Sequence, residues 1–179
     1  CRITMRRTKE DAEKTRHTIL AAAEHPFLER GVAHTSLEQI ARHAGVTRGA
    51  VYWHFQNKAH LFHEMLNQVR LPLEPLAQQL AEVDGLVSLQ LLRDLCIEAM
   101  ANLVLDDQRR RILTVLLRRC EFTEELREAE ERHEAFVNQF IALCEQQFAL
   151  PSVQPLLQPG ITSRLASRAL HAMLVGLFS

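Results

Sequence analysis

Strand-forming patterns are the first feature that this 179-residue sequence lacks. No segment alternates apolar and polar residues over the length of a strand, whereas apolar residues recur at three- and four-residue spacing throughout the chain. Aromatic residues make up only 6% of the sequence, with a single Trp and a single Tyr. The pattern therefore predicts an all-α fold.

Long hydrophobic runs and paired cysteines are absent as well. No stretch approaches the roughly 20 apolar residues of a membrane span, and the N-terminal segment has no apolar region typical of a secretory signal. The four cysteines (Cys1, Cys96, Cys120 and Cys144) form no CxxC pattern, which favours reduced thiols over a disulfide framework. These observations predict a cytoplasmic protein without a membrane partner.

Catalytic motifs are equally scarce. The sequence contains no phosphate-binding glycine loop, no nucleophile elbow, no HExxH and no pair of catalytic carboxylates. His60 and His63, with Glu64 beside them, have a spacing that reaches a metal, but histidines on a helix surface explain them more simply. We expect no metal and no cofactor, and a helical enzyme remains only as an alternative.

Charge is unevenly distributed along the chain. Residues 1–58 contain 10 Lys/Arg and 6 Asp/Glu, a net charge of +4, whereas residues 59–179 contain 11 and 16, a net charge of −5. Scatter in a small segment is one explanation. The other is that the first segment binds a polyanion.

Capping signals divide this basic segment into short helices. Thr8 is the expected N-cap of a first helix that ends at Gly31. Thr35 and Glu38 have the spacing of a capping box, and the helix that they begin would end at Gly45 after two turns.

The rest of the chain reads as a longer series of helices. Pro72 and Pro75 should kink or divide the helix that begins after Asn57. The last helix shows no cap before Ser179, so we expect that the C-terminal end of this part is incomplete. The sequence predicts further helices at 86–105, 108–118, 123–148 and from 162 onward.

Two short helices around "AGVTRGAVYWHFQNK" have the form of a helix-turn-helix. Leu37, Ile40, Ala41, Ala44, Val46, Ala50, Val51 and Phe55 supply the small core between them. That assignment turns a second set outward: Thr47, Arg48, Gly49, Tyr52 and His54. Arg48 has the geometry to bind guanine O6 and N7 in a major groove, Gly49 removes bulk, and Lys58 at the start of the next helix favours a phosphate.

The order of residues in "TSLEQIARHAGVTRGAVYWHFQNKAHLF" closely resembles the signature of the TetR family of one-component bacterial repressors. The resemblance covers residues 8–66 with motif precision. "RRTKEDAEKTRHTILAAAE" and "RRRIL…RRCEFTEEL" extend it toward the subgroup that represses multidrug efflux pumps.

The resemblance implies an all-α homodimer. A three-helix DNA-binding domain (8–57) would be followed by a larger helical domain for ligand binding and dimerisation (58–179). Arg48 and Gly49 would lie at base edges of double-stranded operator DNA, and two copies would reach successive major grooves roughly 34–36 Å apart. The family dimerises through its last two helices, of which this sequence carries the start of the first. The implied phosphate contacts are Thr35, Thr47, Tyr52, His54 and Lys58.

A hydrophobic small-molecule inducer is the second partner that the resemblance implies. Each apolar position by itself is explained by core packing, but a drug pocket is also mostly apolar with a few polar groups. Leu113 and Leu117 stand where relatives can be polar, which favours flat hydrophobic ligands, and Arg70 and His171 are the candidate polar anchors. The implied lining is Val69, Arg70, Leu92, Leu95, Cys96, Ala99, Leu113, Leu117, Phe136, Phe140, Cys144, His171, Leu174 and Val175.

Oxidation is an alternative signal for the same fold. Cys120 lies beside Arg118 and Arg119, whose charges would stabilise a thiolate. The sequence thus favours a ligand-released repressor of an efflux operon and leaves a redox-sensing repressor acting through Cys120 as the alternative.

Overall fold

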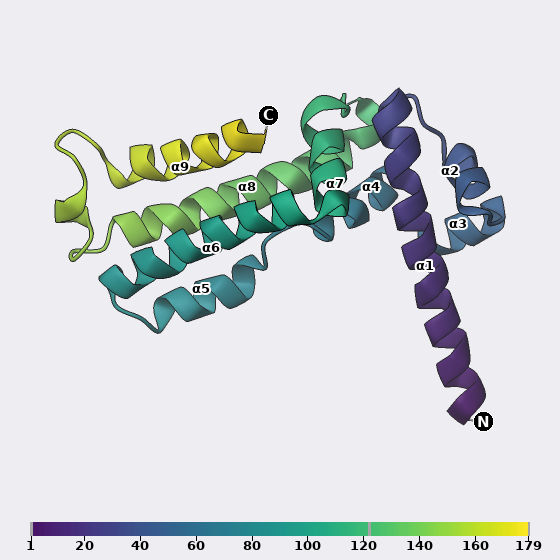
Figure 1. Ribbon diagram of the computed structural model, residues 1–179, viewed down its shortest axis with the longest axis horizontal. Coiled ribbons are helices and arrows are strands. Elements are labelled where there is room, and N and C mark those ends of the chain that lie inside the picture. Colours follow the sequence, from purple (N-terminus) through teal and green to yellow (C-terminus); the bar gives the residue numbers. More distant parts are fainter. Residues whose placement is uncertain (1, 122, 179) are drawn as a thin grey trace. The chain divides into compact units, whose positions relative to one another are not determined.

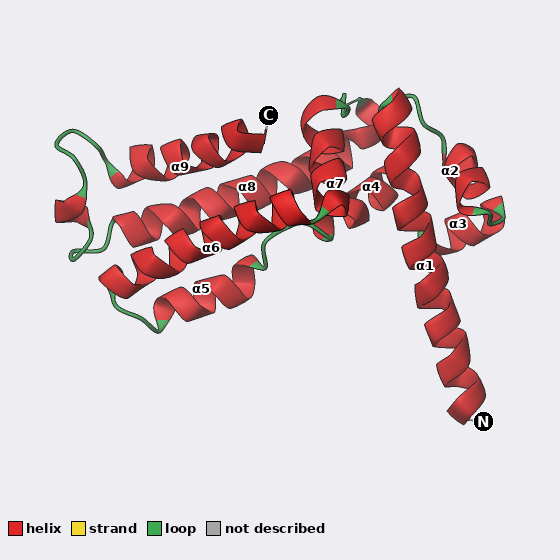
Figure 2. Ribbon diagram, in the orientation of Figure 1, coloured by secondary structure: helices red, strands yellow, loops and turns green. Residues whose placement is uncertain are grey.

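The structure is a computed structural model that describes residues 2–121 and 123–178, and every regular element in these ranges is helical (Figures 1 and 2). The all-α prediction is confirmed for this part of the chain. The elements are α1 (Arg2–Arg30), α2 (Leu37–Ala44), α3 (Arg48–His54), α4 (Lys58–Asn67), α5 (Leu73–Ala81), α6 (Gly85–Leu105), α7 (Asp107–Arg118), the 3₁₀ turn η1 (Glu124–Leu126), α8 (Arg127–Phe148), the 3₁₀ turn η2 (Gln154–Leu156) and α9 (Ser163–Phe178).

The start of the first helix differs from the sequence prediction. α1 begins at Arg2, so the expected N-cap at Thr8 is wrong. The segment before Thr8 contains no Pro or Gly, and nothing in it stops the helix from extending.

The capping box of α2 is shifted by one residue from the prediction. Ser36, not Thr35, is the N-cap: its hydroxyl accepts from the Gln39 amide at 3.2 Å, and the Gln39 side chain accepts from the Ser36 amide at 2.8 Å. Thr35 has an equally suitable type and spacing, but its side chain is buried. There its hydroxyl donates to the carbonyls of Gly31 at 2.8 Å and Pro26 at 3.1 Å. Thr35 therefore fastens the end of α1, and Ser36 begins α2.

The chain folds into two compact units. The first comprises Cys1–Val69 and Arg111–Glu131, and the second comprises Arg70–Arg110 and Arg132–Ser179. The helix-turn-helix therefore shares its unit with α4, most of α7 and η1. The domain boundary at residues 57 and 58 remains a prediction.

The first unit is built on an aromatic core. Phe27 of α1 and Phe62 of α4 meet edge to face, with ring centroids 5.9 Å apart, and Phe55 is fully buried in the same cluster. Ile112 and Val115 of α7 and Leu126 of η1 complete it. α1 packs against both α2 and α3, so this core fixes the helix-turn-helix on α1 and α4 (Figure 1).

The second unit has a separate core, to which α5, α6, α8 and α9 contribute (Figure 1). Leu76, Leu92 and Phe140 are buried there, with Leu170 and Leu174 of α9 packed against them. A Cβ added to Gly85 at the start of α6 would collide with the Ser152 hydroxyl, so this close approach requires glycine. In the described residues, no helix is both long enough and apolar enough to span a bilayer.

Candidate functional sites

The seven-residue helix α3 begins at an N-cap and ends where its chain enters the core. The Thr47 hydroxyl accepts from the Ala50 amide at 3.1 Å, and Phe55 follows the helix in an extended conformation. Val51 and Phe55 are fully buried, as the sequence predicts. Thr47, Arg48, Gly49 and Tyr52 are exposed together, and His54 is half-buried.

Two glycines lie near the start of this helix: Gly45 ends α2, and Gly49 is the second residue of α3. They are suited to their positions for different reasons. Gly45 ends α2 with φ of 66°, a left-handed conformation that disfavours other residues. Gly49 has no such constraint: a Cβ added there would meet only the Thr47 hydroxyl, at 3.9 Å. The fold would therefore tolerate a side chain at position 49 and does not itself require glycine. The effect of glycine here is to keep the exposed face of α3 flat.

The Arg48 side chain contacts two neighbouring residues. Its guanidinium pairs with the carboxylate of Glu38 on α2 and lies 5.3 Å from the centroid of the Tyr52 ring. A side-chain hydrogen bond with Tyr52, and then the charge of Glu38, raise the pKa of Arg48 above its ordinary value. Arg48 is therefore a cation on the exposed face of α3, with Glu38 and Tyr52 as its neighbours.

The aromatic end of α3 includes a residue that the sequence analysis did not select. Trp53 is 73% exposed, and its ring meets the His54 ring edge to face at a centroid distance of 4.5 Å. Burial, then the nearby Arg16, lowers the pKa of His54, so its imidazole is neutral at pH 7. Trp53 is the only Trp of the chain and stands between Tyr52 and His54, which the sequence predicted to face outward. The sequence did not indicate that Trp53 is exposed as well.

Two of the expected phosphate contacts are not exposed in this structure. Thr35 is 1% exposed and uses its hydroxyl at the end of α1. Lys58 is 5% exposed: its ammonium donates to the Ala33 carbonyl at 3.0 Å and pairs with the Glu125 carboxylate at 2.8 Å. Sequence spacing placed both residues beside the helix-turn-helix but carried no information about Glu125, which lies 67 positions after Lys58.

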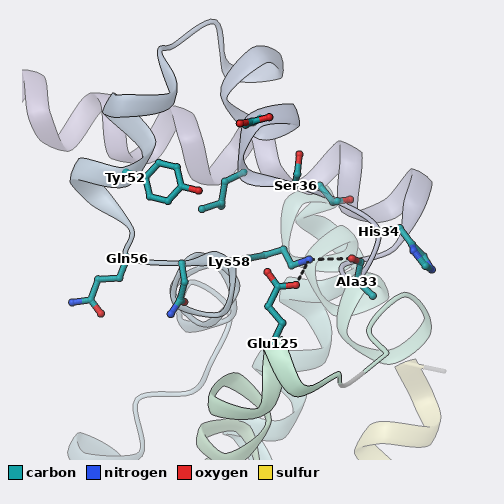
Figure 3. A pocket seen from close by; sticks show the side chains of 11 residues that line it. Ala33, His34, Ser36, Tyr52, Gln56, Lys58 and Glu125 are labelled. Carbon is teal, nitrogen blue, oxygen red and sulfur yellow. Dashed lines mark hydrogen bonds and ion pairs between the residues drawn. The ribbon is translucent and has the colours of Figure 1, made fainter.

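A cavity of about 460 Å³ opens beside these groups (Figure 3). Figure 3 shows Lys58 reaching toward Ala33 and Glu125, with the Tyr52 hydroxyl on the other side of the cavity. The cavity receives polar side chains from α2, α3 and α4 of the first unit, from the loops beside these helices and from η1. The lining consists of residues 33–38, Tyr52, residues 56–58 and Glu125.

The second unit contains most of the expected ligand-binding residues. Leu92, Phe140 and Cys144 are buried in its core. Leu95, Phe136 and Leu174 pack against that core, and Ala99 and Val175 are half-buried on α6 and α9. The remaining three expected residues, Val69, Leu113 and Leu117, belong to the first unit, where Val69 packs against the first core.

The two candidate polar anchors lie against the aromatic rings of this core. The Arg70 guanidinium lies 5.0 Å from the Phe136 centroid, and the His171 and Phe140 ring centroids are 6.4 Å apart. Burial, then the charges of Arg70 and His171, lowers the pKa of His133. His133 is therefore a third polar residue of this group, which its place on α8 between two charged residues did not reveal in the sequence.

The three described cysteines are free thiols. Burial, then Glu130, raises the pKa of Cys120 to about 12, despite an opposing effect of Lys58. Burial, then Cys96, raises the pKa of Cys144 to about 12 as well. A thiol with such a pKa is almost entirely protonated at pH 7, which opposes rapid oxidation at Cys120. The described residues also contain no group of three His, Cys, Asp or Glu positioned to hold a metal ion.

Comparison with known families assigns both parts of the chain. Residues 19–65 match "Bacterial regulatory proteins, tetR family", and residues 88–179 match "MAATS-type transcriptional repressor, C-terminal region". The chain belongs to the TetR family. This membership confirms the predicted fold class and places the chain among transcriptional regulators rather than enzymes.

Individual TetR-family relatives are similar over most of the chain. The HTH-type transcriptional regulator TtgR of Pseudomonas putida is 43% identical over 133 residues, which are 74% of this chain and 63% of TtgR. The chain thus spans about 63% of the length of the curated relatives that it matches first.

Solved structures of two repressors also resemble it. NalD, the secondary repressor of the MexAB-OprM multidrug efflux pump in Pseudomonas aeruginosa, has 64% sequence identity and a TM-score of 0.86 over 94% of this chain and 83% of NalD. The complex of SmeT with triclosan has 31% identity and a TM-score of 0.74 over 92% of this chain and 78% of SmeT. SmeT is the repressor of the Stenotrophomonas maltophilia multidrug efflux pump SmeDEF.

Proposed function

We propose that this TetR-family protein represses a multidrug efflux operon and leaves its operator when a hydrophobic small molecule binds. The observation that carries the proposal is the pairing of two features in one chain. An exposed, capped recognition helix presents Arg48 and Gly49, and a separate apolar core carries Arg70, His133 and His171 among aromatic rings. The similarity to NalD, TtgR and SmeT supports efflux control. The protein would act in the cytoplasm, where operator DNA lies.

On operator DNA, α3 would enter the major groove with Arg48 and Gly49 at base edges. Contacts with Glu38 and Tyr52 restrict the Arg48 side chain before it binds, which would reduce the entropy lost on binding a guanine. Thr47, Tyr52 and the neutral His54 would donate to phosphates, and Trp53 joins this surface because it is exposed beside them. Thr35 would act indirectly, by fixing the end of α1 beneath α2.

In the second unit, the inducer would lie among Leu92, Leu95, Phe136, Phe140 and Leu174. Aromatic and aliphatic side chains favour a flat apolar compound, and the polar group of that compound would face Arg70, His133 or His171. Cys96, Ala99, Cys144 and Val175 would add to this wall, while a contribution of Val69, Leu113 and Leu117, which belong to the first unit, remains a prediction. Triclosan, the ligand of the SmeT complex, is a compound of this class.

Release of operator by ligand tests the proposal. A DNA fragment selected from a random library for binding to this protein is labelled, and the complex is titrated with triclosan while fluorescence anisotropy is followed. We expect triclosan to dissociate the wild-type complex, because the ligand-bound state should have lower affinity for operator than the free state. His171→Ala should require about tenfold more triclosan if a hydrogen bond to His171 is lost.

A parallel titration with hydrogen peroxide separates the redox alternative from ligand release. The raised pKa of Cys120 opposes that alternative, so wild type and Cys120→Ser should hold operator equally well in peroxide. Release by peroxide alone, and only when Cys120 is present, would overturn the ligand proposal.

A further inference from the structure

The ammonium group of Lys58 is a buried cation close to the recognition surface. Lys58 begins α4, directly after the N-cap Asn57, and its side chain is 5% exposed. The family resemblance implies that this residue binds a DNA phosphate, yet both of its observed partners belong to the protein. They are the Ala33 carbonyl at 3.0 Å and the Glu125 carboxylate at 2.8 Å (Figure 3).

Glu125 differs from Lys58 in exposure. Its side chain is 57% exposed, so the carboxylate leaves the pair for water at little cost, whereas an uncompensated Lys58 cannot stay buried. The same carboxylate lines the cavity between α2, α3 and the start of α4. A phosphate and a carboxylate are both anions that accept from an ammonium group, and two anions placed at one ammonium group repel each other.

The main chain fastens the end of α7, shortly before η1, to the same region. The Val32 amide donates to the Arg119 carbonyl at 3.0 Å, and a Cβ on Gly31 would lie 3.3 Å from that carbonyl. Leu126, the residue after Glu125, is fully buried in the core of the first unit. The chain is therefore anchored to the first unit before Glu125, at Arg119, and directly after it, at Leu126. These anchors keep the backbone of Glu125 near Lys58.

We propose that Glu125 competes with operator DNA for Lys58. The carboxylate takes the place of a phosphate while the protein is free, and Lys58 becomes available for DNA only when this ion pair opens. The inference rests on the proposed binding to operator DNA and on the phosphate contact that the family resemblance implies for Lys58, and it makes Glu125 a residue that lowers operator affinity without touching DNA.

The experiment compares charge-neutralising variants at neighbouring positions. Glu125→Gln removes the competing charge and keeps the shape of the side chain. Glu124→Gln makes the same change in net charge one residue earlier, where the carboxylate is 80% exposed and pairs with Arg127 at 3.1 Å. Operator affinity is measured by anisotropy at several salt concentrations for both variants, for Lys58→Met and for the double variant Lys58→Met/Glu125→Gln.

We expect Glu125→Gln to bind operator about fivefold more tightly than both wild type and Glu124→Gln at low salt, which is the upper end of the range for an ion pair with an exposed partner. Lys58→Met should weaken binding and reduce the salt slope by about one per protomer. In the Lys58→Met background, Glu125→Gln should give no gain. Thermal unfolding of each variant checks that a change in affinity does not follow a change in folding.

The outcomes separate the two proposals. If Lys58→Met weakens binding but Glu125→Gln behaves like Glu124→Gln, the competition is wrong and the phosphate contact stands. A gain from Glu125→Gln that persists without Lys58 also overturns the competition, because it reflects direct repulsion between Glu125 and DNA. If Lys58→Met binds with unchanged affinity and salt slope, Lys58 does not contact DNA and both proposals fail.

Discussion

At the scale of single residues, Arg48, which we propose reads a base edge, also has two partners within the protein. Glu38 binds one side of the guanidinium, and the Tyr52 ring lies 5.3 Å away. DNA must displace Glu38 or share the guanidinium with it, whereas the stacking on Tyr52 can persist. Arg48 should therefore contribute more to the choice of sequence than to overall affinity.

Replacing Arg48 with Ala tests this division. We expect the preference for the selected operator over a scrambled sequence to fall at least about fivefold, because a bidentate contact to guanine discriminates by about 1–3 kcal/mol. Competition binding with both DNAs measures the ratio. Arg110→Ala is the matched control, since Arg110 belongs to the second unit and pairs with Asp107 on α7. Equal preference ratios for the two variants would remove Arg48 from the base-reading surface.

At the scale of elements, the sequence predicted helices better than their first residues. The end of α2 was predictable because Gly45 alone suits a left-handed φ of 66° there. Its start was ambiguous because Thr35 with Glu38 and Ser36 with Gln39 satisfy the same spacing rule. Only burial of Thr35 against the end of α1 decides between them, and burial depends on residues far along the chain.

The same limit applies to the candidate site. The outward set on α3 followed from helical periodicity around Val51 and Phe55, which are local signals. The Lys58–Glu125 pair and the grouping of Arg70 with His133 and His171 join different helices. Such contacts depend on tertiary packing, which sequence spacing does not encode.

The capping assignment makes a prediction at the same scale. Ser36→Ala should lower the free energy of unfolding by about 1 kcal/mol, since it removes the acceptor of the Gln39 amide. The shift is measured from the midpoint of urea unfolding followed by circular dichroism. Glu38→Gln should change the midpoint less, because Glu38 is exposed and does not cap α2. A larger fall of the midpoint in Glu38→Gln than in Ser36→Ala would instead support a capping box formed by Thr35 and Glu38.

At the scale of the whole molecule, the chain passes between its two units at three places. These are Val69 to Arg70, Arg110 to Arg111 within α7, and Glu131 to Arg132 within α8. Two of the three crossings lie inside continuous helices, whose backbone hydrogen bonds resist local bending. If the inducer binds in the second unit as proposed, α7 and α8 are the helices whose continuous chain connects that unit to the first.

Self-association is the other property of the whole molecule. Met173 and Leu177, one turn apart on α9, are 55% and 58% exposed, and we propose that they contribute to the C-terminal dimer that the family resemblance implies. Met173→Glu should raise the dimer dissociation constant at least tenfold and weaken operator binding at low protein concentration. Sedimentation equilibrium measures the association.

Leu86→Glu is the control for this prediction, because Leu86 is also 55% exposed but lies at the start of α6. An unchanged dissociation constant in Met173→Glu, or an equal loss in both variants, would exclude α9 as the interface.

Trp53 gives the protein a built-in optical reporter. It is the only indole in the chain, it is 73% exposed on α3, and its ring meets the neutral His54. Tryptophan emission from this molecule therefore arises from the recognition helix alone and contains no signal from the second unit. Quenching on DNA or recovery on release can be followed in real time without a label, and a ligand that alters the emission in the absence of DNA has changed the environment of α3.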